Sequence, residues 1–232
     1  MSQIIRRDFT ARPDEAEAAL ARLIRAQLMT GMEARGRASL VLSGGRTPSR
    51  IMPLVADMDI DWDKVFITLT DERWTSLDDP ASTQGALQQM MAGTPMEKAQ
   101  FFGLYHGDMT LEEAPQKLSP AFHRVFPDPF DVIFLGMGED GHTASLFPSR
   151  AWGNACEQDG LPLVADLSPP VLPQRISLCP SALLNARAIG MIVAGTAKQD
   201  MLQQALAGRN EAKLPIAVLG RDCQASIELF MV

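Results

Sequence analysis

The stretch from Phe130 to Pro148, FDVIFLGMGEDGHTASLFP, constrains the fold of this chain more than any other. Its residues 132–135, VIFL, form an unbroken apolar run, which is expected for a strand buried on both faces of a parallel sheet. Gly136, Gly138 and Gly141 follow, and they let the backbone turn sharply and let a ligand approach it closely. Because open α/β sheets bind ligands at the carboxyl ends of their strands, the stretch predicts a ligand site.

The same turn carries acidic side chains and an imidazole, on Glu139, Asp140 and His142. An imidazole can be neutral near physiological pH and can act as a general base. An ordinary strand-to-helix loop with solvated acids is the simpler interpretation, but Asp-Gly-His inside a glycine turn favours a functional site. After the turn, Thr143 is placed to cap a short helix through Leu146.

A second glycine turn follows an expected strand at residues 38–42 and has the sequence SGGRTP. Its glycines allow backbone N–H groups to converge on an anion, and the helix expected after it offers its positive N-terminal end. It matches neither the dinucleotide-binding pattern nor the P-loop. A turn without a ligand remains the alternative to a site for one phosphate group, whose candidate residues are Ser43, Gly44, Gly45 and Thr47.

The expected strand at residues 64–70 ends directly before Asp71 and Arg73. Charges at this end of an apolar strand again indicate the ligand edge of the sheet. Asp71 could accept a sugar hydroxyl or orient a water, and Arg73 could bind an anion or a developing oxyanion. A simple Asp–Arg ion pair at the start of a loop is the alternative.

The rest of the chain alternates between helical and extended patterns, which predicts an α/β fold. This fold is a mostly parallel sheet with helices on both faces, in one domain over residues 1–232 with room for a small extra lobe. Residues 149–174 are rich in Pro and Gly and are expected to form a long connection. Further helices are expected at residues 13–34, 51–55, 84–91, 110–124 and 181–185, and from about Lys198 to Ala207. Further strands are expected at residues 101–104, 175–178, 188–194, 214–219 and 226–232.

Composition excludes several classes of protein. The net charge of −7 and the lack of a Lys/Arg run argue against nucleic-acid binding. No apolar run approaches membrane-spanning length, and the N-terminal residues lack an apolar signal core. Three scattered cysteines, Cys156, Cys179 and Cys223, show neither metal spacing nor a disulfide framework, which predicts a reducing cytoplasm.

Four stretches together resemble the 6-phosphogluconolactonase family, in the family's order and over nearly the whole chain. They are SGGRTP, DERW with SLDDPAST after it, LGMGEDGHTASLFP, and the region from Arg175 to Gln199. The resemblance implies hydrolysis of 6-phospho-D-glucono-1,5-lactone to 6-phosphogluconate in the oxidative pentose phosphate pathway. It also implies no cofactor and a Rossmann-like fold shared with glucosamine-6-phosphate deaminases and ribose-5-phosphate isomerases.

The resemblance also implies roles for individual residues. His142 matches the catalytic histidine and would activate water, with Asp140 holding the ring. Arg73 and Arg175 would stabilise the oxyanion or grip the phosphate, with the division between them open. The phosphate site would consist of Ser43, Gly44, Gly45, Thr47 and Lys198.

The chain departs from the family pattern at a few positions. Ser82-Thr83 stands where relatives usually have Ser-Asn, Thr75 stands for their Val, and the C-terminal ending differs. An amino-sugar phosphate deaminase or isomerase is the nearest alternative, but the glutamate of those enzymes falls at Phe147, which cannot transfer a proton. A non-catalytic sugar-phosphate sensor is the second alternative. Such a protein would not need Asp140 and His142 together.

Overall fold

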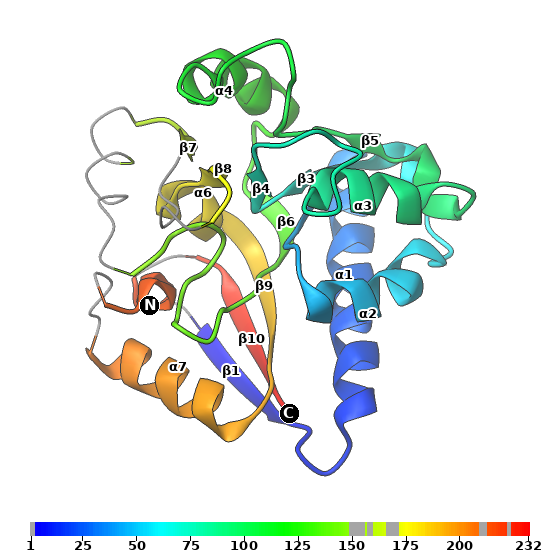
Figure 1. The fold of residues 1–232 in the computed structure, drawn as a ribbon. Helices are drawn as coiled ribbons and strands as arrows, with labels where there is room; N and C mark the ends of the chain where they lie inside the picture. The colour runs from blue at the N-terminus through cyan, green and yellow to red at the C-terminus, as the bar shows by residue number, and fades with distance from the viewer. Residues whose placement is uncertain (1–2, 149–155, 157–159, 166–171, 209–212, 222–223) are drawn as a thin grey trace.

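The computed structural model describes residues 3–148, 156, 160–165, 172–208, 213–221 and 224–232, without the side chains of residues 46 and 47. Its centre is a seven-stranded sheet in the order β1-β10-β9-β6-β2-β3-β5 (Figure 1). All pairs in this sheet are parallel. The strands are β1 (Gln3–Asp8), β2 (Ala38–Leu42), β3 (Val65–Leu69), β5 (Gln100–Phe101), β6 (Phe130–Phe134), β9 (Ala186–Val193) and β10 (Ser226–Met231).

A second, three-stranded antiparallel sheet lies beside the first. It consists of β4 (Asp71–Arg73), β8 (Arg175–Leu178) and β7 (Leu163–Ala165), with β8 in the middle. The register places Arg73 opposite Arg175 and Asp71 opposite Ser177. Two segments more than a hundred positions apart in the chain are thereby brought together.

Helices cover both faces of the parallel sheet. Figure 1 shows α1 and α2 on one side and α6 and α7 on the other. The α-helices are α1 (Pro13–Arg35), α2 (Arg46–Ala56), α3 (Thr83–Met91), α4 (Ala114–Val125), α6 (Pro180–Leu184) and α7 (Thr196–Gly208). Short 3₁₀ helices are η1 (Trp62–Lys64), η2 (Pro95–Lys98) and η3 (Pro215–Gly220). This arrangement confirms the predicted α/β fold class.

The longest helix, α1, follows its sequence pattern closely. It begins at Pro13, whose missing N–H costs nothing in a first turn, and ends at Gly36, which adopts a left-handed φ of 72°. Leu20, Ile24 and Leu28 form its apolar stripe and are fully buried. The predicted helix at residues 13–34 is therefore confirmed.

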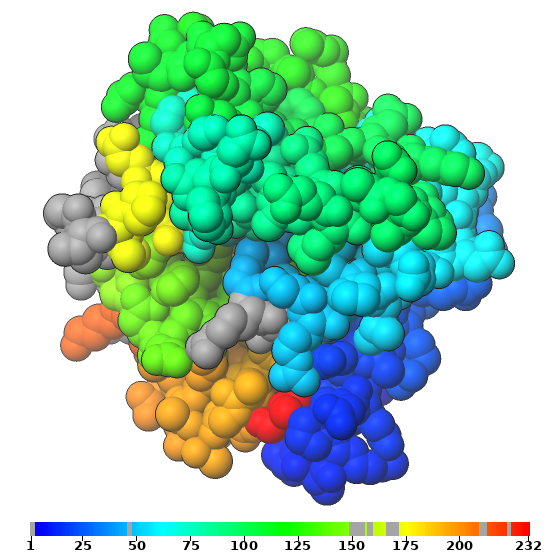
Figure 2. All heavy atoms as spheres, turned by 45° about the vertical axis from the view of Figure 1, so that its right-hand side comes forward, coloured from blue at the N-terminus to red at the C-terminus, as the bar shows by residue number. Residues whose placement is uncertain are grey.

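The central strands explain where the site lies. Every residue of β2 and β6 is buried, as expected for strands covered on both faces. Because the strands are parallel, the loops after β2, β3, β6 and β9 all leave from the same edge of the sheet. On the face shown in Figure 2, the segment after β6 (light green), helix α2 (blue to cyan) and helix α7 (orange) lie around the same region of surface.

Two expected elements are wrong. Residues 143–146 form a tight turn instead of a helix, with a bridge between Thr143 and Leu146. Ala144 has a φ of 47°, which a right-handed helix does not allow. The expected strand at residues 214–219 is replaced by η3, and the place beside β10 that it could have filled is taken by β1.

Other differences concern boundaries and weak patterns. Strand β1 was not expected, because it is an edge strand with mostly exposed side chains and little apolar sequence. Helix α4 begins at Ala114, with Pro115 in its first turn, and not at Thr110. β5 lies one residue earlier than expected and is shorter. Most of the connection at residues 149–174 falls outside the described residues, although β7 lies within it.

The cysteines also correct an expectation. Cys156 and Cys179 form a disulfide, with their Cα atoms 5.6 Å apart. Cys179 follows β8 directly, and its N–H donates to the carbonyl of Pro162. The pairing of β7 with β8 thus brings the two segments together, which the separation of 23 residues did not reveal. Cys223 lies outside the described residues, and the cytoplasmic location remains a prediction.

Candidate active site

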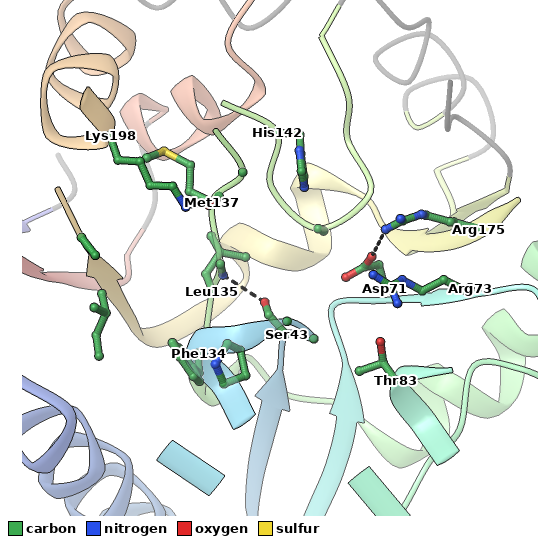
Figure 3. A pocket seen from close by; sticks show the side chains of 18 residues that line it. Ser43, Asp71, Arg73, Thr83, Phe134, Leu135, Met137, His142, Arg175 and Lys198 are labelled. Carbon is green, nitrogen blue, oxygen red and sulfur yellow. Dashed lines mark hydrogen bonds and ion pairs between the residues drawn. The ribbon is translucent and has the colours of Figure 1, made fainter. Parts of the chain in front are cut away.

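A polar cavity of about 230 Å³ lies at the carboxyl edge of the parallel sheet. Its walls come from the loops after β2, β3, β6 and β9, together with β8 and the start of α3. Figure 3 shows His142 above the cavity, Lys198 to one side, and Asp71, Arg73 and Arg175 to the other. Of the predicted site residues, it collects Ser43, Gly44, Gly45, Asp71, Arg73, His142, Arg175 and Lys198.

His142 and Asp140 form a close pair within the glycine turn. Asp140 Oδ1 lies 2.5 Å from His142 Nδ1 and also accepts the backbone N–H of His142 at 3.1 Å. Partial burial raises the pKa of Asp140, but the N–H bond and the nearby ring outweigh this, so that the pKa lies below its ordinary value. The carboxylate therefore fixes the proton of the ring on Nδ1 and leaves Nε2 as an acceptor.

The glycines of this turn are required by the close packing around the ring. A Cβ at Gly138 would lie 2.2 Å from Cε1 and Nδ1 of His142 and 2.8 Å from the carboxylate of Asp140. Gly141 has a φ of 81°, a conformation that other residues rarely adopt. The centroid of the Phe147 ring lies 4.7 Å from that of the His142 ring. The imidazole thus packs closely against both the backbone of the turn and an aromatic ring.

Asp71 is buried and acts as the centre of a hydrogen-bond network. Its Oδ1 accepts the hydroxyl of Thr70 at 2.9 Å, and its Oδ2 accepts the hydroxyl of Ser145 at 2.6 Å. Arg175 Nη1 lies 3.6 Å from the same Oδ2. Since both oxygens are engaged, Asp71 is placed to orient these groups, which makes it a poor candidate for a base.

Ser43 belongs to the same network. Its Oγ accepts the N–H of Gly136 at 3.0 Å and lies 3.0 Å from Thr70 Oγ1. Because the single proton of Thr70 goes to Asp71, Ser43 must donate in the second contact. The hydroxyl of Ser43 therefore joins the loops after β2, β3 and β6. The donors that remain for an anion at this turn are the backbone N–H groups of Gly44 and Gly45, which make no hydrogen bond within the described part of the chain.

The two arginines provide positive charge on one side of the cavity. Arg73 Nη1 donates to the carbonyl of Ala81 at 2.5 Å. Arg175 is mostly buried, and burial together with the nearby Arg73 lowers the pKa of its guanidinium. Among the described residues, Nε of Arg175 is the buried side-chain nitrogen that has no hydrogen-bond partner. A guanidinium with free donors beside a second cation is suited to binding an oxyanion.

Lys198 provides the charge on the other side. It lies in the first turn of α7, where a cation opposes the helix dipole, and its Nζ donates to the carbonyl of Met137 at 2.9 Å. His142 lies between Lys198 and the arginines in Figure 3. Thr47 lies in the first turn of α2, but its side chain is outside the part of the chain that the structure describes.

The sequence did not indicate four residues that build this site. Thr70 and Ser145 orient Asp71, and Thr83 lies so close to Gly44 that a Cβ there would be 2.6 Å from Thr83 Oγ1. Glu72 is fully buried and stands in the chain between Asp71 and Arg73, which line the cavity. Glu72, Thr83 and Ser145 lie inside the stretches that carry the family resemblance. Their residue types alone did not separate them from solvated loop residues, because hydroxyl and carboxyl groups are common in loops.

The arrangement of the side chains that could bind a metal ion leads to a first prediction. In the described part of the chain, no three His, Cys, Asp or Glu side chains lie together in a way that could hold a metal ion. If the chain hydrolyses the lactone that the sequence resemblance implies, we expect this activity to survive exhaustive treatment with EDTA, measured as the rate of lactone hydrolysis above the spontaneous background. A loss that added Mg²⁺ or Zn²⁺ restores would contradict this expectation.

The described helices include none that is long and apolar enough to cross a membrane.

Comparison with known proteins shows which family this chain resembles in sequence and fold. Residues 11–227 match the family described as glucosamine-6-phosphate isomerases/6-phosphogluconolactonase. A 6-phosphogluconolactonase of Pseudomonas putida is 37% identical over 88% of this chain and 85% of its own length. The corresponding protein of Caulobacter vibrioides is 33% identical over 95% and 94%. The crystal structure of a 6-phosphogluconolactonase from Shewanella baltica superposes with a TM-score of 0.89 at 35% identity, covering 100% of this chain and 98% of that one.

Proposed function

This chain belongs to the family of glucosamine-6-phosphate isomerases and 6-phosphogluconolactonases, and we propose that it hydrolyses 6-phospho-D-glucono-1,5-lactone with His142 as the general base. The relatives named above are lactonases, and this chain is an enzyme of the same kind. The observation that carries the mechanism is the pairing of His142 Nδ1 with Asp140, because it leaves Nε2 free to take a proton from water.

The first step is the attack of water on C1 of the lactone. Nε2 of His142 removes a proton from the water as its oxygen bonds to the carbonyl carbon. The carbonyl oxygen then carries the negative charge, which Arg73 and Arg175 are placed to stabilise. Asp140 remains a carboxylate and stabilises the imidazolium that forms.

The second step opens the ring. The tetrahedral intermediate collapses, the bond between C1 and the ring oxygen breaks, and the imidazolium returns its proton to that oxygen. The products are the free 5-hydroxyl group and the carboxyl group of 6-phosphogluconate. The reaction consumes one water, and His142 ends in its initial state.

The phosphate is proposed to bind away from the reacting carbon. Lys198 offers a charged donor, and the turn after β2 offers the N–H groups of Gly44 and Gly45 at the start of α2. Holding the phosphate positions the distant ester beside His142, which converts binding into a rate advantage. Unphosphorylated gluconolactone should therefore be a poor substrate.

Removal of the Lys198 amine tests this phosphate site. A hydrogen bond between two charged groups contributes strongly to the free energy of binding. We therefore expect Lys198→Ala to raise KM for the phosphorylated lactone by about 10- to 100-fold. The variant should change turnover of unphosphorylated gluconolactone little. Lys117→Ala, which removes an exposed lysine paired with Glu113 on α4, is the matched control. Equal use of both lactones by the parent protein would rule out the phosphate site.

A further inference from the structure

Glu72 is a fully buried carboxylate next to the catalytic cavity but not in its wall. It follows Asp71 in β4, and strand alternation turns the two side chains to opposite faces. Burying a carboxylate is unfavourable unless donors surround it. Burial accordingly raises the pKa of Glu72, although the N–H groups of Thr83, Gln84 and Arg73 oppose this effect.

The carboxylate of Glu72 is bonded on both oxygens. Oε1 accepts the backbone N–H groups of Arg73 at 2.6 Å and Thr83 at 2.9 Å. Oε2 accepts the N–H of Gln84 and, at 3.2 Å, the hydroxyl of Ser82. The hydroxyl of Ser82 in turn accepts the N–H of Gly85 at 2.9 Å. Glu72 and Ser82 thus share the capping of the first turn of α3.

These bonds position both the backbone and the guanidinium of Arg73. Glu72 binds its backbone N–H, and it also fixes the segment Ser82–Gln84, which directly follows Ala81. The carbonyl of Ala81 accepts the guanidinium of Arg73. The position of this guanidinium in the cavity therefore depends on a loop that the carboxylate of Glu72 anchors.

The same anchor sets the position of Thr83. This residue lines the cavity and packs against Gly44 with no room for a Cβ. Moving the start of α3 would therefore move Thr83 against the glycine turn whose N–H groups are proposed to bind phosphate. One buried carboxylate thus connects two walls of the site.

We propose that Glu72 is a positioning residue for lactone hydrolysis: through the backbone of Arg73 and the start of α3, it holds the guanidinium of Arg73 in the cavity. This inference rests on the proposed function. Glu72 acts through these neighbours and does not touch the substrate. Glutamine at this position keeps the size of the side chain, but its NH₂ group would face the N–H of Gln84, so at least one of the bonds must be lost.

The test is a double-mutant cycle with Arg73. Residues that share one hydrogen-bond network couple strongly, so Glu72→Gln should lower kcat/KM by about 10- to 100-fold in the parent protein. In the Arg73→Ala background, the same change should have much less effect, because the guanidinium that it misplaces is gone. Steady-state kinetics of all four proteins and the affinity for 6-phosphogluconate, measured by calorimetry, give the coupling.

Gln84→Ala is the matched structural control. Gln84 is also buried at the start of α3, but its Oε1 accepts the N–H groups of Leu104 and Tyr105, away from the cavity. It should lower the midpoint of thermal unfolding and leave kcat/KM nearly unchanged. Equal losses in both Arg73 backgrounds, or a loss in Gln84→Ala as large as in Glu72→Gln, would overturn the proposal. An inactive parent protein would instead overturn the proposed function.

Discussion

Replacement of His142 by alanine is expected to lower kcat for the phosphorylated lactone by about 10²- to 10⁴-fold, the usual contribution of a general base. The ring is partly exposed and lies in a surface turn, so the variant should fold normally. The groups proposed to hold the phosphate remain in place. The affinity for 6-phosphogluconate should therefore fall far less than kcat does. The measurement is ring opening followed at constant pH, with the spontaneous rate subtracted.

Asp140→Asn is the companion variant to this experiment. The amide keeps the size of the side chain but removes the charge that faces Nδ1 at 2.5 Å. It should reduce kcat with product affinity retained, because the imidazolium loses its partner in the transition state. Parent-level hydrolysis by folded His142→Ala would show that the ring is not the base. Asp71 is buried and both of its oxygens accept hydrogen bonds, so it is poorly placed to act as a substitute base in this geometry.

Features that depend on local sequence were predictable. Buried strands such as β2 and β6 have continuous apolar sequences, and α1 has an apolar stripe between a proline and a glycine. The rule that parallel strands direct their following loops to one edge then places Ser43, Asp71, His142 and Lys198 around one cavity. The sequence therefore predicted that these residues lie close together at one edge of the sheet.

Asp140 as the partner of His142 was predictable, but the partners that lie far apart in the sequence were not. The bond between Ser145 and Asp71 joins residues 74 positions apart, and it depends on how two loops pack. Glu72 has the sequence context of a solvated loop acid but lies fully buried under donors from α3. Thr143 was expected to cap a helix, but Ala144 adopts a left-handed φ of 47° and residues 143–146 form a turn. In each of these cases the side-chain partners, the burial or the backbone conformation depend on tertiary contacts, which the local sequence does not specify.

The replacement of Gly138 by alanine is expected to have the second largest effect, a loss of about 10²-fold in kcat/KM. The new methyl group would lie 2.2 Å from the ring of His142, well inside contact distance. The ring or the turn must therefore move, and a displacement of about 1 Å in a catalytic group can cost about 10²-fold. Gly136→Ala is the matched control in the same turn, because its methyl group would meet Ser43 Cβ at 3.5 Å, an ordinary contact.

A cycle with His142 separates displacement of the ring from general damage to the turn. If the methyl group acts by pushing the imidazole away, it can do no further harm once that ring is absent. The double variant Gly138→Ala/His142→Ala should therefore have the same residual rate as His142→Ala alone, with the affinity for 6-phosphogluconate retained in both. A further large loss in the double variant would mean that Gly138 has another role, such as leaving space for the substrate beside the backbone. Parent-level activity in Gly138→Ala would show that the turn can accommodate the methyl group and that the exact position of the ring matters less than the contacts with Asp140 and Phe147 indicate.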